Sequence, residues 1–407
     1  MQRLATERVL EALEESPAVL IHGPRQSGKT TLAKEIGGQR GYAYFSLDDD
    51  ALLAAAQVDP VGFVADLPAR TIIDEIQRAP TLFTSLKAVI DADRAAGRFI
   101  LTGSSNVLLL PTLADSLAGR MEVIKLLPLS QVELLGSKPW FLSATESGAF
   151  PRRPARRLGQ RLAELILAGG YPAALARTTP ARRARWYLDY VDALVQRDVR
   201  DLANIANLDV LPRLMEAAAS QTARLLNVSE LAAPFQVSRQ TIRDYVTLLE
   251  RVFLIDEQQP LHLNRLARLV KSAKLHIGDT GLGGALLRVD ATSLYEERAL
   301  FEQLLETFVY QELRRQAVAQ EVEPRLFHYR DRDQYEVDIV LQFGANRLGG
   351  VEVKASSTVT EGDFRGLRKL AGAAGTAFTA GVVLYDGEHT LSFGDKLYAV
   401  PIDAIWH

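Results

Sequence analysis

The chain contains 407 residues, of which 47% are hydrophobic and 24% are charged, and its net charge is −3. This composition is typical of a folded globular protein, and the length predicts two or three domains. The absence of cysteine excludes disulfide scaffolds, thiolate metal sites and cysteine nucleophiles. No uncharged apolar run approaches the length of a membrane span, and the first residues show no secretion signal. We therefore expect a cytoplasmic protein that does not bind a membrane.

Apolar, strand-like runs alternate with helical patterns in the first part of the chain. The expected strands are Ala18–His22, Tyr42–Leu47, Thr71–Ile76, Arg98–Thr102 and Glu122–Leu126, and the expected helices include Lys29–Ile36 and Thr81–Asp91. Strands that alternate with helices predict an α/β domain with a parallel sheet covered on both faces. Glycines and prolines that follow Leu135 mark the end of this domain, which we place at residues 1–150.

A phosphate-binding loop follows the first expected strand. The matching residues are Gly23, Pro24, Arg25, Gln26, Ser27, Gly28, Lys29 and Thr30, and Thr31 completes the predicted nucleotide-binding set. They fit the pattern G-x-x-x-x-G-K-[ST], placed between a strand and a helix as its mechanism requires. The two glycines let the backbone wrap phosphates, Lys29 reaches the outer phosphates, and the Thr30 hydroxyl can hold Mg²⁺. The sequence therefore predicts a site for ATP with Mg²⁺.

Two acids end the expected strand at Thr71, as in a Walker B segment. Asp74 is predicted to hold Mg²⁺ through water, and Glu75 to orient and deprotonate the attacking water. The alternative is a pair of acids that merely ends a strand. The next expected strand runs into Ser104, which we predict to contact the γ-phosphate, with Ser105 and Asn106 close behind.

Residues 151–275 form a second expected domain, which is helical. The segment 151–200 contains eleven arginines and four acids, a balance that suits phosphate neutralisation or a solvated helix face equally. Further on, two short helices capped by Ser229 and Ser238, then a strand at Val252–Ile255, resemble a winged helix. In that interpretation Arg239, Gln240 and Arg243 would face nucleic acid. A packing or subunit-contact module explains the same pattern.

Residues 276–407 form the third expected domain, which carries a second cluster of charged residues. Asp338 lies on one expected strand, and Glu352 and Lys354 share one face of the next. A hairpin turn between these strands would bring the two acids together. Asp338 and Glu352 could then bind Mg²⁺ or Mn²⁺ while Lys354 positions water. Alternatively, the charges occupy the wet face of a hairpin.

Taken together, these segments resemble bacterial AAA-type (AAA+) ATPases that carry a C-terminal domain of unknown function, whose core looks like a PD-(D/E)XK nuclease. The matching segments are GPRQSGKTTL at 23–32, IIDEIQRAP at 72–80, LTGSSN at 101–106, LAGR at 117–120, LPLS at 127–130, GGYPAAL at 169–175, QRDV at 196–199, GDTGL at 278–282, LLETFVYQEL at 304–313, EVDIVL at 336–341 and VEVKAS at 351–356. They span most of the chain.

The resemblance adds three expectations. Arg120 would act as an arginine finger on a neighbouring subunit's nucleotide, which implies a homo-oligomer such as a hexameric ring; a salt bridge within the chain is the alternative. Glu306 would match the acid on the first helix of the nuclease fold. Val337 departs from the motif, which names proline before Asp338.

The sequence favours an ATPase that moves or remodels DNA, possibly branched or Holliday-junction DNA, and cuts it with a metal-dependent nuclease domain. The alternative is an ATP-driven switch, or a DNA-binding ATPase, in which the nuclease-like domain is inert. Salt-sensitive DNA binding that stimulates ATP turnover would favour the first function. ATP turnover that is indifferent to DNA, with a stable protein partner, would favour the second.

Overall fold

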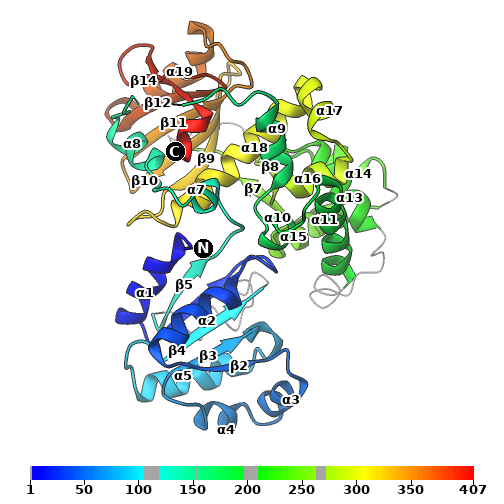
Figure 1. The fold of residues 1–407 in the computed structure, drawn as a ribbon, viewed down its shortest axis with the longest axis vertical. Helices are drawn as coiled ribbons and strands as arrows, with labels where there is room; N and C mark the ends of the chain where they lie inside the picture. The colour runs from blue at the N-terminus through cyan, green and yellow to red at the C-terminus, as the bar shows by residue number, and fades with distance from the viewer. Residues whose placement is uncertain (1, 105–118, 153–154, 197–209, 236, 263–271) are drawn as a thin grey trace. The chain divides into compact units, whose positions relative to one another are not determined.

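The computed structural model (Figure 1) describes residues 2–104, 119–152, 155–196, 210–235, 237–262 and 272–407. The chain divides into two compact units. Unit 1 comprises Met1–Leu129 with Arg251–Phe253, and unit 2 comprises Ser130–Glu250 with Leu254–His407. The three-domain division at residues 150 and 275 stays a prediction. Within the described residues, no helix combines the length and apolar character that crossing a bilayer demands.

Unit 1 alternates strands and helices as the sequence predicts. Its strands are β1 (Ala18–His22), β2 (Ala43–Ser46), β3 (Thr71–Asp74), β4 (Phe99–Gly103) and β5 (Met121–Lys125). Its helices are α1 (Ala5–Glu15), α2 (Lys29–Arg40), α3 (Asp50–Val58), α4 (Pro60–Ala65), the 3-10 helix η1 (Ile76–Arg78) and α5 (Leu82–Ala92). The strands form one parallel sheet in the order β2-β3-β4-β1-β5. The predicted α/β organisation of this part is confirmed.

Helices bury both faces of this sheet. Ala18 and Leu20 of β1 lie in a core cluster with Phe83 and Leu86 of α5. Val19 points to the opposite face because side chains alternate along a strand, and it is equally buried. Helices α1 and α2 also pack against β1 (Figure 1). The buried central strand therefore holds the phosphate-binding loop at its carboxyl end.

The first part of unit 2 is mostly helical, with one small sheet. Its helices are α7 (Gln131–Leu135), α8 (Phe141–Ser147), α9 (Gln160–Ala168), α10 (Pro172–Leu175), α11 (Pro180–Leu194), α13 (Val210–Ser220), α14 (Val228–Ala232), α15 (Arg239–Arg251), α16 (Thr280–Leu287) and α17 (Ala291–Glu296). Its strands are β6 (Arg224–Leu225), β7 (Ile255–Gln258) and β8 (Lys274–Ile277). They pair antiparallel in the order β6-β8-β7.

Two details of this region differ from the sequence-based expectation. Asn227, not Ser229, caps α14, because its side-chain oxygen accepts the N–H groups of the first helical turn. Ser238 does cap α15, through a backbone N–H at 3.0 Å. The strand expected at Val252–Ile255 begins only at its last residue, because Phe253 adopts the left-handed conformation with a φ of 62°. Strand pairing therefore begins only at Ile255, the first residue of β7.

The last part of unit 2 is a mixed sheet with two long helices. Its elements are α18 (Arg298–Ala317), β9 (Arg325–Arg330), β10 (Glu336–Phe343), β11 (Arg347–Val353), η4 (Glu361–Phe364), α19 (Arg365–Ala374), η5 (Gly375–Ala377), β12 (Phe378–Tyr385), β13 (Leu391–Ser392), β14 (Leu397–Pro401) and η6 (Ile402–Ile405). The sheet order is β13-β14-β12-β11-β10-β9. Strands β9, β10 and β11 form an antiparallel meander, and α19 crosses over to β12, which is parallel to β11. The hairpin predicted between the acid-bearing strands is therefore present.

Asp279 is a fully buried acid that joins three segments of unit 2. Its carboxylate accepts the Gly170 N–H at 2.8 Å and the Gly281 N–H at 3.0 Å. It also pairs with Arg315 of α18 at 2.8 Å, and both side chains are almost inaccessible to solvent. A buried charge is tolerated only when it is paired and hydrogen-bonded. The contacts of Asp279 therefore fix α16, α18 and the loop after α9 to one another.

We expect Asp279→Ala to destabilise unit 2 strongly. The substitution removes the carboxylate from a buried ion pair with Arg315, and breaking a buried pair costs about 3–5 kcal/mol. Asp290→Ala is the matched control, because Asp290 caps α17 from an exposed position and its loss costs about 1 kcal/mol. Urea unfolding followed by circular dichroism measures both variants. Equal midpoints for the two would contradict the assigned role.

Two buried histidines lie beside the acid-bearing strands, His276 on β8 and His328 on β9. Gln258 links the His276 ring to the acid-bearing strand β10. Its side-chain amide donates to the Asp338 carbonyl at 2.9 Å, and its side-chain oxygen lies 3.1 Å from His276 Nε2. Burial, reinforced by the Lys274 ammonium, lowers the pKa of His328 to about 4. The same causes lower the pKa of His276 well below 6.5. Both rings are therefore neutral in the folded protein at neutral pH.

These histidines predict an acid-sensitive fold. Below pH 6.5 the histidines of the unfolded chain bind protons, whereas the buried rings of the native protein stay neutral. The free energy of unfolding therefore falls as the pH drops from about 6.5 towards about 4. One such group contributes up to about 1.4 kcal/mol per pH unit. We expect His328→Gln to flatten this slope, whereas His389→Gln, at an exposed position, keeps it. Urea midpoints between pH 7 and pH 4.5 test this, and an unchanged slope in His328→Gln would contradict it.

Candidate nucleotide site and carboxylate cluster

The phosphate-binding loop connects β1 to α2 and is built around two glycines. A Cβ at Gly23 would lie 2.1 Å from the Leu126 carbonyl oxygen, and Gly28 has a φ of 99°, so neither position accepts a side chain. Lys29 is buried, and its ammonium donates to the carbonyls of Gly23 at 3.0 Å and Pro24 at 2.7 Å. The Lys29 side chain therefore folds back onto the loop. A phosphate would bind in this loop.

The other predicted loop residues differ in exposure. Ser27 is buried, and no partner is found for its hydroxyl among the described residues. Arg25 and Thr30 are half-buried, while Gln26 and Thr31 are exposed. A buried hydroxyl without a partner is costly unless a ligand or water satisfies it. The loop is therefore shaped to accept hydrogen-bonding oxygens such as those of a phosphate.

Thr30 and Asp74 meet at the carboxyl ends of neighbouring strands. The Thr30 hydroxyl lies 2.9 Å from Asp74 Oδ1. Thr102 of β4 also donates to this carboxylate, and the Tyr44 hydroxyl donates to Oδ2 at 2.8 Å. Burial and the bond to Asp74 raise the pKa of Tyr44 to about 12, so Tyr44 remains a donor. A carboxylate and a hydroxyl are the hard oxygen ligands that suit Mg²⁺.

Glu75 follows β3 in an unusual conformation and is held by two polar residues. Its φ of 58° is in the left-handed region, which non-glycine residues adopt at an energetic cost and mostly at functional sites. Ser104 donates to Glu75 Oε2 at 2.8 Å. Gln77 donates to the same oxygen and, at 2.8 Å, to the Ser104 hydroxyl. The structure thus brings the predicted water-activating acid and Ser104 together, with Gln77 between them.

Arg120 pairs within its own unit. Its guanidinium forms a two-pronged contact with Asp91 of α5, at 2.6 Å and 3.0 Å. The hydrogen bond from Arg120 lowers the pKa of the Asp91 carboxyl. This is the intrachain salt bridge that the sequence left open, while the role in a neighbouring subunit stays a prediction. Leu117, Ala118, Ser105 and Asn106 lie outside the described residues.

The residues predicted to face nucleic acid lie on α15, and two of them are engaged within the chain. Arg243 forms a two-pronged ion pair with Glu257 of β7, at 2.7 Å and 3.1 Å. Gln240 donates to Asp244 at 2.9 Å. Arg239 is exposed. The Arg243 contacts hold α15 to β7. A packing role therefore explains this arginine as well as nucleic-acid recognition does.

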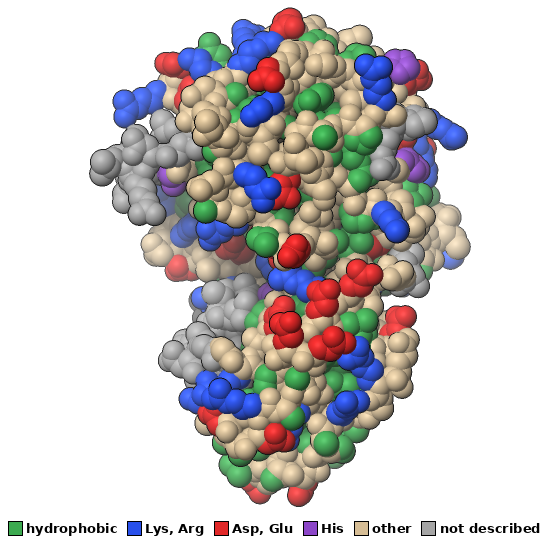
Figure 2. All heavy atoms as spheres, turned by 90° about the vertical axis from the view of Figure 1, so that its left-hand side faces the viewer, with side chains coloured by type: hydrophobic (Ala, Val, Ile, Leu, Met, Phe, Trp, Pro, Cys, Tyr) green, Lys and Arg blue, Asp and Glu red, His purple; other side chains and the backbone are tan. Residues whose placement is uncertain are grey.

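The arginine-rich segment is also partly paired. Arg185 contacts Asp189 at 2.9 Å, and Arg161 contacts Glu164. Figure 2 shows the side that lies at the left of Figure 1, away from α11, and basic side chains there are scattered among acidic ones. Surface pairs of this kind contribute little to stability, and they leave less free positive charge for phosphates. Arg153, Arg197 and Arg200, with most of the segment 196–199, lie outside the described residues.

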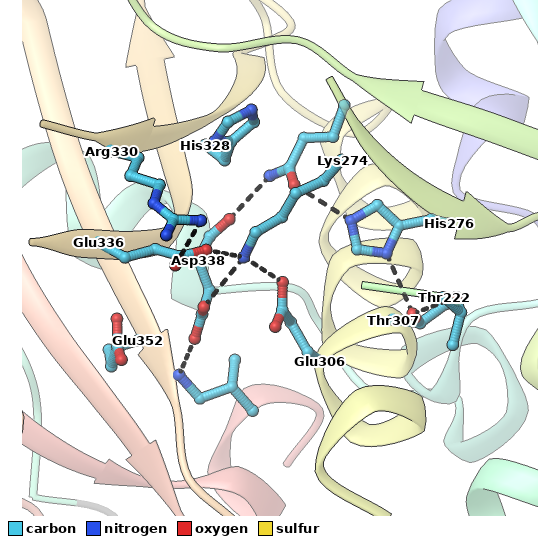
Figure 3. Close-up of polar contacts among 12 residues, drawn as sticks. Thr222, Lys274, His276, Glu306, Thr307, His328, Arg330, Glu336, Asp338 and Glu352 are labelled. Atoms are coloured by element: carbon cyan, nitrogen blue, oxygen red, sulfur yellow. Dashed lines mark hydrogen bonds and ion pairs between the residues drawn. The ribbon is translucent and has the colours of Figure 1, made fainter. Parts of the chain in front are cut away.

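A buried lysine joins the acids of the last domain (Figure 3). Lys274 of β8 is 2% exposed, and its ammonium lies 2.7 Å from Glu306, 2.7 Å from Glu336 and 3.2 Å from Asp338. Burial alone would lower the pKa of Lys274, but the three carboxylates raise it well above its usual range. The ammonium therefore stays charged and occupies the space between the acids. We call Lys274, Glu306, Glu336 and Asp338 the carboxylate cluster.

Glu352 and Lys354 form a separate pair beside this cluster. The Lys354 ammonium lies 2.8 Å from Glu352 Oε1, while Glu352 Oε2 is buried without a partner among the described residues. Burial and the nearby Asp338 carboxylate raise the pKa of Glu352. Both side chains border an open pocket whose other walls include Asp363 and Arg365. The structure therefore brings the four predicted residues into one region, but divides them between the carboxylate cluster, which holds Glu306 and Asp338, and the Glu352–Lys354 pair.

The arrangement does not fit a divalent metal between Asp338 and Glu352. Asp338 uses Oδ1 for Lys274 and accepts the Val353 N–H with Oδ2 at 3.0 Å. As the side chains of the described residues are placed, no group of three or more acidic, histidine or cysteine residues is arranged to hold a metal ion. A metal needs several converging oxygens with free lone pairs. Here oxygens of Glu306, Glu336 and Asp338 converge on the Lys274 ammonium, while Glu352 pairs with Lys354.

Sequence reasoning missed Lys274, Glu336 and Gln77. Glu336 could have been found, because it is two residues before Asp338 and shares its face of β10. Lys274 gave no signal: it lies in the short run KLHI and contacts acids 32, 62 and 64 positions away. Gln77 follows the predicted acids, but its contact with Ser104 depends on how β3 and β4 align.

Three family descriptions match successive parts of the chain. Residues 15–135 match "AAA domain", residues 159–293 match "Domain of unknown function (DUF8612)" and residues 301–405 match "Domain of unknown function (DUF4143)". The AAA match covers the phosphate-binding loop, Asp74, Glu75 and Ser104. The DUF4143 match covers α18 and the six-stranded sheet.

Relatives and solved structures add similarity across most of the chain. An uncharacterized protein of Mycobacterium tuberculosis is 28% identical over 405 residues, which are 99% of this chain and 84% of that protein. An uncharacterized protein of Methanocaldococcus jannaschii is 24% identical over 344 residues, which are 81% of this chain and 72% of that protein. The Walker-type ATPase of Pyrococcus abyssi aligns with 70% of this chain and 95% of its own, at 16% identity and a TM-score of 0.39. The family matches indicate a P-loop ATPase domain of the AAA type at residues 15–135, which implies ATP as its ligand, followed by a C-terminal DUF4143 domain.

Proposed function

We propose that the protein is an ATP-driven switch: it hydrolyses ATP with Mg²⁺ in unit 1, and its C-terminal domain has a nuclease-like fold that does not cut DNA. The observation that carries the hydrolysis is the convergence of Thr30, Asp74, Glu75 and Ser104 at one edge of a parallel sheet. Mg²⁺ held by Thr30 and Asp74 would neutralise charge on the outer phosphates. Glu75 would accept a proton from the attacking water.

The same residues suggest how nucleotide changes the conformation of the loop. Lys29 now donates to two backbone carbonyls, and a bound phosphate would draw its ammonium away from them because the anion is the stronger acceptor. Ser104 and Gln77 hold Glu75. Contact of Ser104 with a γ-phosphate would loosen that hold, so the position of Glu75 would report which nucleotide is bound.

A second candidate, ATP-driven remodelling of DNA, is favoured by the order of elements in unit 2. The succession α13-β6-α14-α15-β7-β8, with an antiparallel three-stranded sheet, supports the winged-helix interpretation. In this candidate Arg239 and the arginine-rich segment would contact phosphates. The engagement of Arg243 with Glu257 favours the switch, in which α15 is a packing helix.

Assembly into a homo-oligomeric ring belongs to the same proposal. A trans-acting Arg120 would have to leave Asp91 and reach a neighbouring nucleotide, since an arginine finger acts by stabilising charge on the transferring phosphoryl group. The contact with Asp91 is partly exposed, and such pairs cost little to break. Nucleotide-dependent ring formation would therefore exchange one partner of Arg120 for another.

The nuclease-like character of the C-terminal domain is inferred from its topology. The order α18-β9-β10-β11-α19-β12, with a meander followed by a parallel strand, is compatible with the PD-(D/E)XK core that the sequence motif suggests and supports this inference. The contacts of Asp338 argue against cutting, because its oxygens are engaged by Lys274 and by the Val353 N–H. We therefore favour an inert domain over a metal-dependent nuclease.

We expect purified protein to hydrolyse ATP only with Mg²⁺. Glu75→Gln should lower turnover about 10²–10⁴-fold, the usual contribution of a positioned base, while still binding nucleotide. Lys29→Ala should lose nucleotide binding. The control is Lys87→Ala, on α5 and outside the site, which should match the wild type. Phosphate release and binding of a fluorescent ATP analogue measure these effects, and full turnover in Glu75→Gln would refute the role of Glu75.

We expect no DNA cleavage by the wild type. Labelled linear, flayed and four-way DNA should stay intact with Mg²⁺ or Mn²⁺, with or without ATP, and DNA should not change the rate of ATP turnover. Asp338→Ala is assayed in parallel. Cleavage by the wild type that disappears in Asp338→Ala would establish the nuclease and overturn the inert domain, and ATP turnover accelerated by DNA would favour remodelling over the switch.

A further inference from the structure

We propose that Lys274 is a built-in cation that replaces a divalent metal in the carboxylate cluster. The proposal rests on the inert nuclease-like domain inferred above and explains what took the place of its metal. One ammonium contacts carboxylates from two different elements, Glu306 from α18 and both Glu336 and Asp338 from β10. Figure 3 shows all three acids pointing toward the same nitrogen.

The position of the ammonium is set by the fold and not by a mobile side chain. Lys274 lies on β8, where it pairs with Leu225 of β6 and Gln258 of β7. Gln258 in turn donates to the Asp338 carbonyl at 2.9 Å, which holds β7 and β8 against β10. The lysine stem is buried along its length, at 2% exposure. The strand β8 therefore fixes the position of the Lys274 ammonium between the acids.

The same oxygens cannot serve a metal while Lys274 is present. A divalent ion bound to Glu306 and Asp338 would have to lie about 2.0–2.6 Å from their oxygens, within the space that the ammonium fills. Two cations at that separation repel each other strongly in a site shielded from water. The centre of the carboxylate cluster is thus occupied permanently by a cation that cannot exchange.

The replacement also removes the chemistry that a metal supplies. An ammonium balances charge and donates hydrogen bonds, but it has no coordination position at which water could be made nucleophilic or a phosphate oxygen polarised. The cluster then contributes to folding instead, because it joins the strand β8 to α18 and β10. Removal of Lys274 should uncover a latent metal site.

The test is Mn²⁺ binding to nucleotide-free, full-length protein, followed by electron paramagnetic resonance and by thermal unfolding. Lys274→Met should bind one more Mn²⁺ per chain than the wild type, and Mn²⁺ should raise its Tm by about 4 °C or more. The Tm of the wild type should not respond. The matched control is Lys354→Met, which removes the neighbouring lysine but leaves Lys274 in place and should gain no Mn²⁺.

Each outcome decides the assignment. Mn²⁺ binding by the wild type that is lost in Asp338→Asn would overturn it, and so would a soluble Lys274→Met that gains no ion. If Lys274→Met does not fold, the double variant Lys274→Met/Glu336→Gln carries one acid fewer and is titrated in its place. Because binding of Mn²⁺ is measured without DNA or ATP, this result is independent of the cleavage and turnover assays.

Discussion

The organisation of unit 2 depends on the cost of burying charge. An ammonium removed from water must be surrounded by acceptors, and Lys274 meets this requirement with three carboxylates. Those acids would repel one another as carboxylates, and the ammonium that lies between them offsets part of this repulsion. Burial and Asp338 raise the pKa of Glu306 well above its usual range. The elements that carry these four residues therefore cannot separate without exposing unpaired charge.

Unit 1 obeys a different constraint, the common direction of its strands. In a parallel sheet all carboxyl ends lie at one edge, so loops that follow adjacent strands meet there. The register places His22 of β1 beside Gly103 of β4, and Ile73 of β3 beside Leu101. The residues that follow these positions are the phosphate-binding loop, the two acids and Ser104. Hydrolytic chemistry is thus assembled by strand direction, with few buried charges.

This difference explains how much could be predicted from the sequence. The parallel sheet, the phosphate-binding loop and the position of Asp74 and Glu75 at the end of β3 follow from short, local patterns, and the predicted α/β fold of this part is confirmed. The hairpin that carries Asp338 and Glu352 was predicted for the same reason. The partner of Asp338 was not, because Lys274 lies on a strand of another sheet. The partners of Arg243 and Arg120, Glu257 and Asp91, were not predicted because they depend on which elements pack together.

Two buried lysines show why a motif alone does not determine chemistry. Lys29 donates to neutral carbonyls of its own loop, and a phosphate can compete for it because an anion binds an ammonium more strongly than a carbonyl does. Lys274 is already surrounded by carboxylates, so no incoming anion improves its environment and no incoming cation finds room. The first lysine can therefore respond to a ligand, while the second holds the fold. Asp338, Glu352 and Lys354 keep the spacing of a nuclease motif. That spacing supports metal-dependent chemistry only when the cation beside the acids is an exchangeable metal ion and not a fixed ammonium.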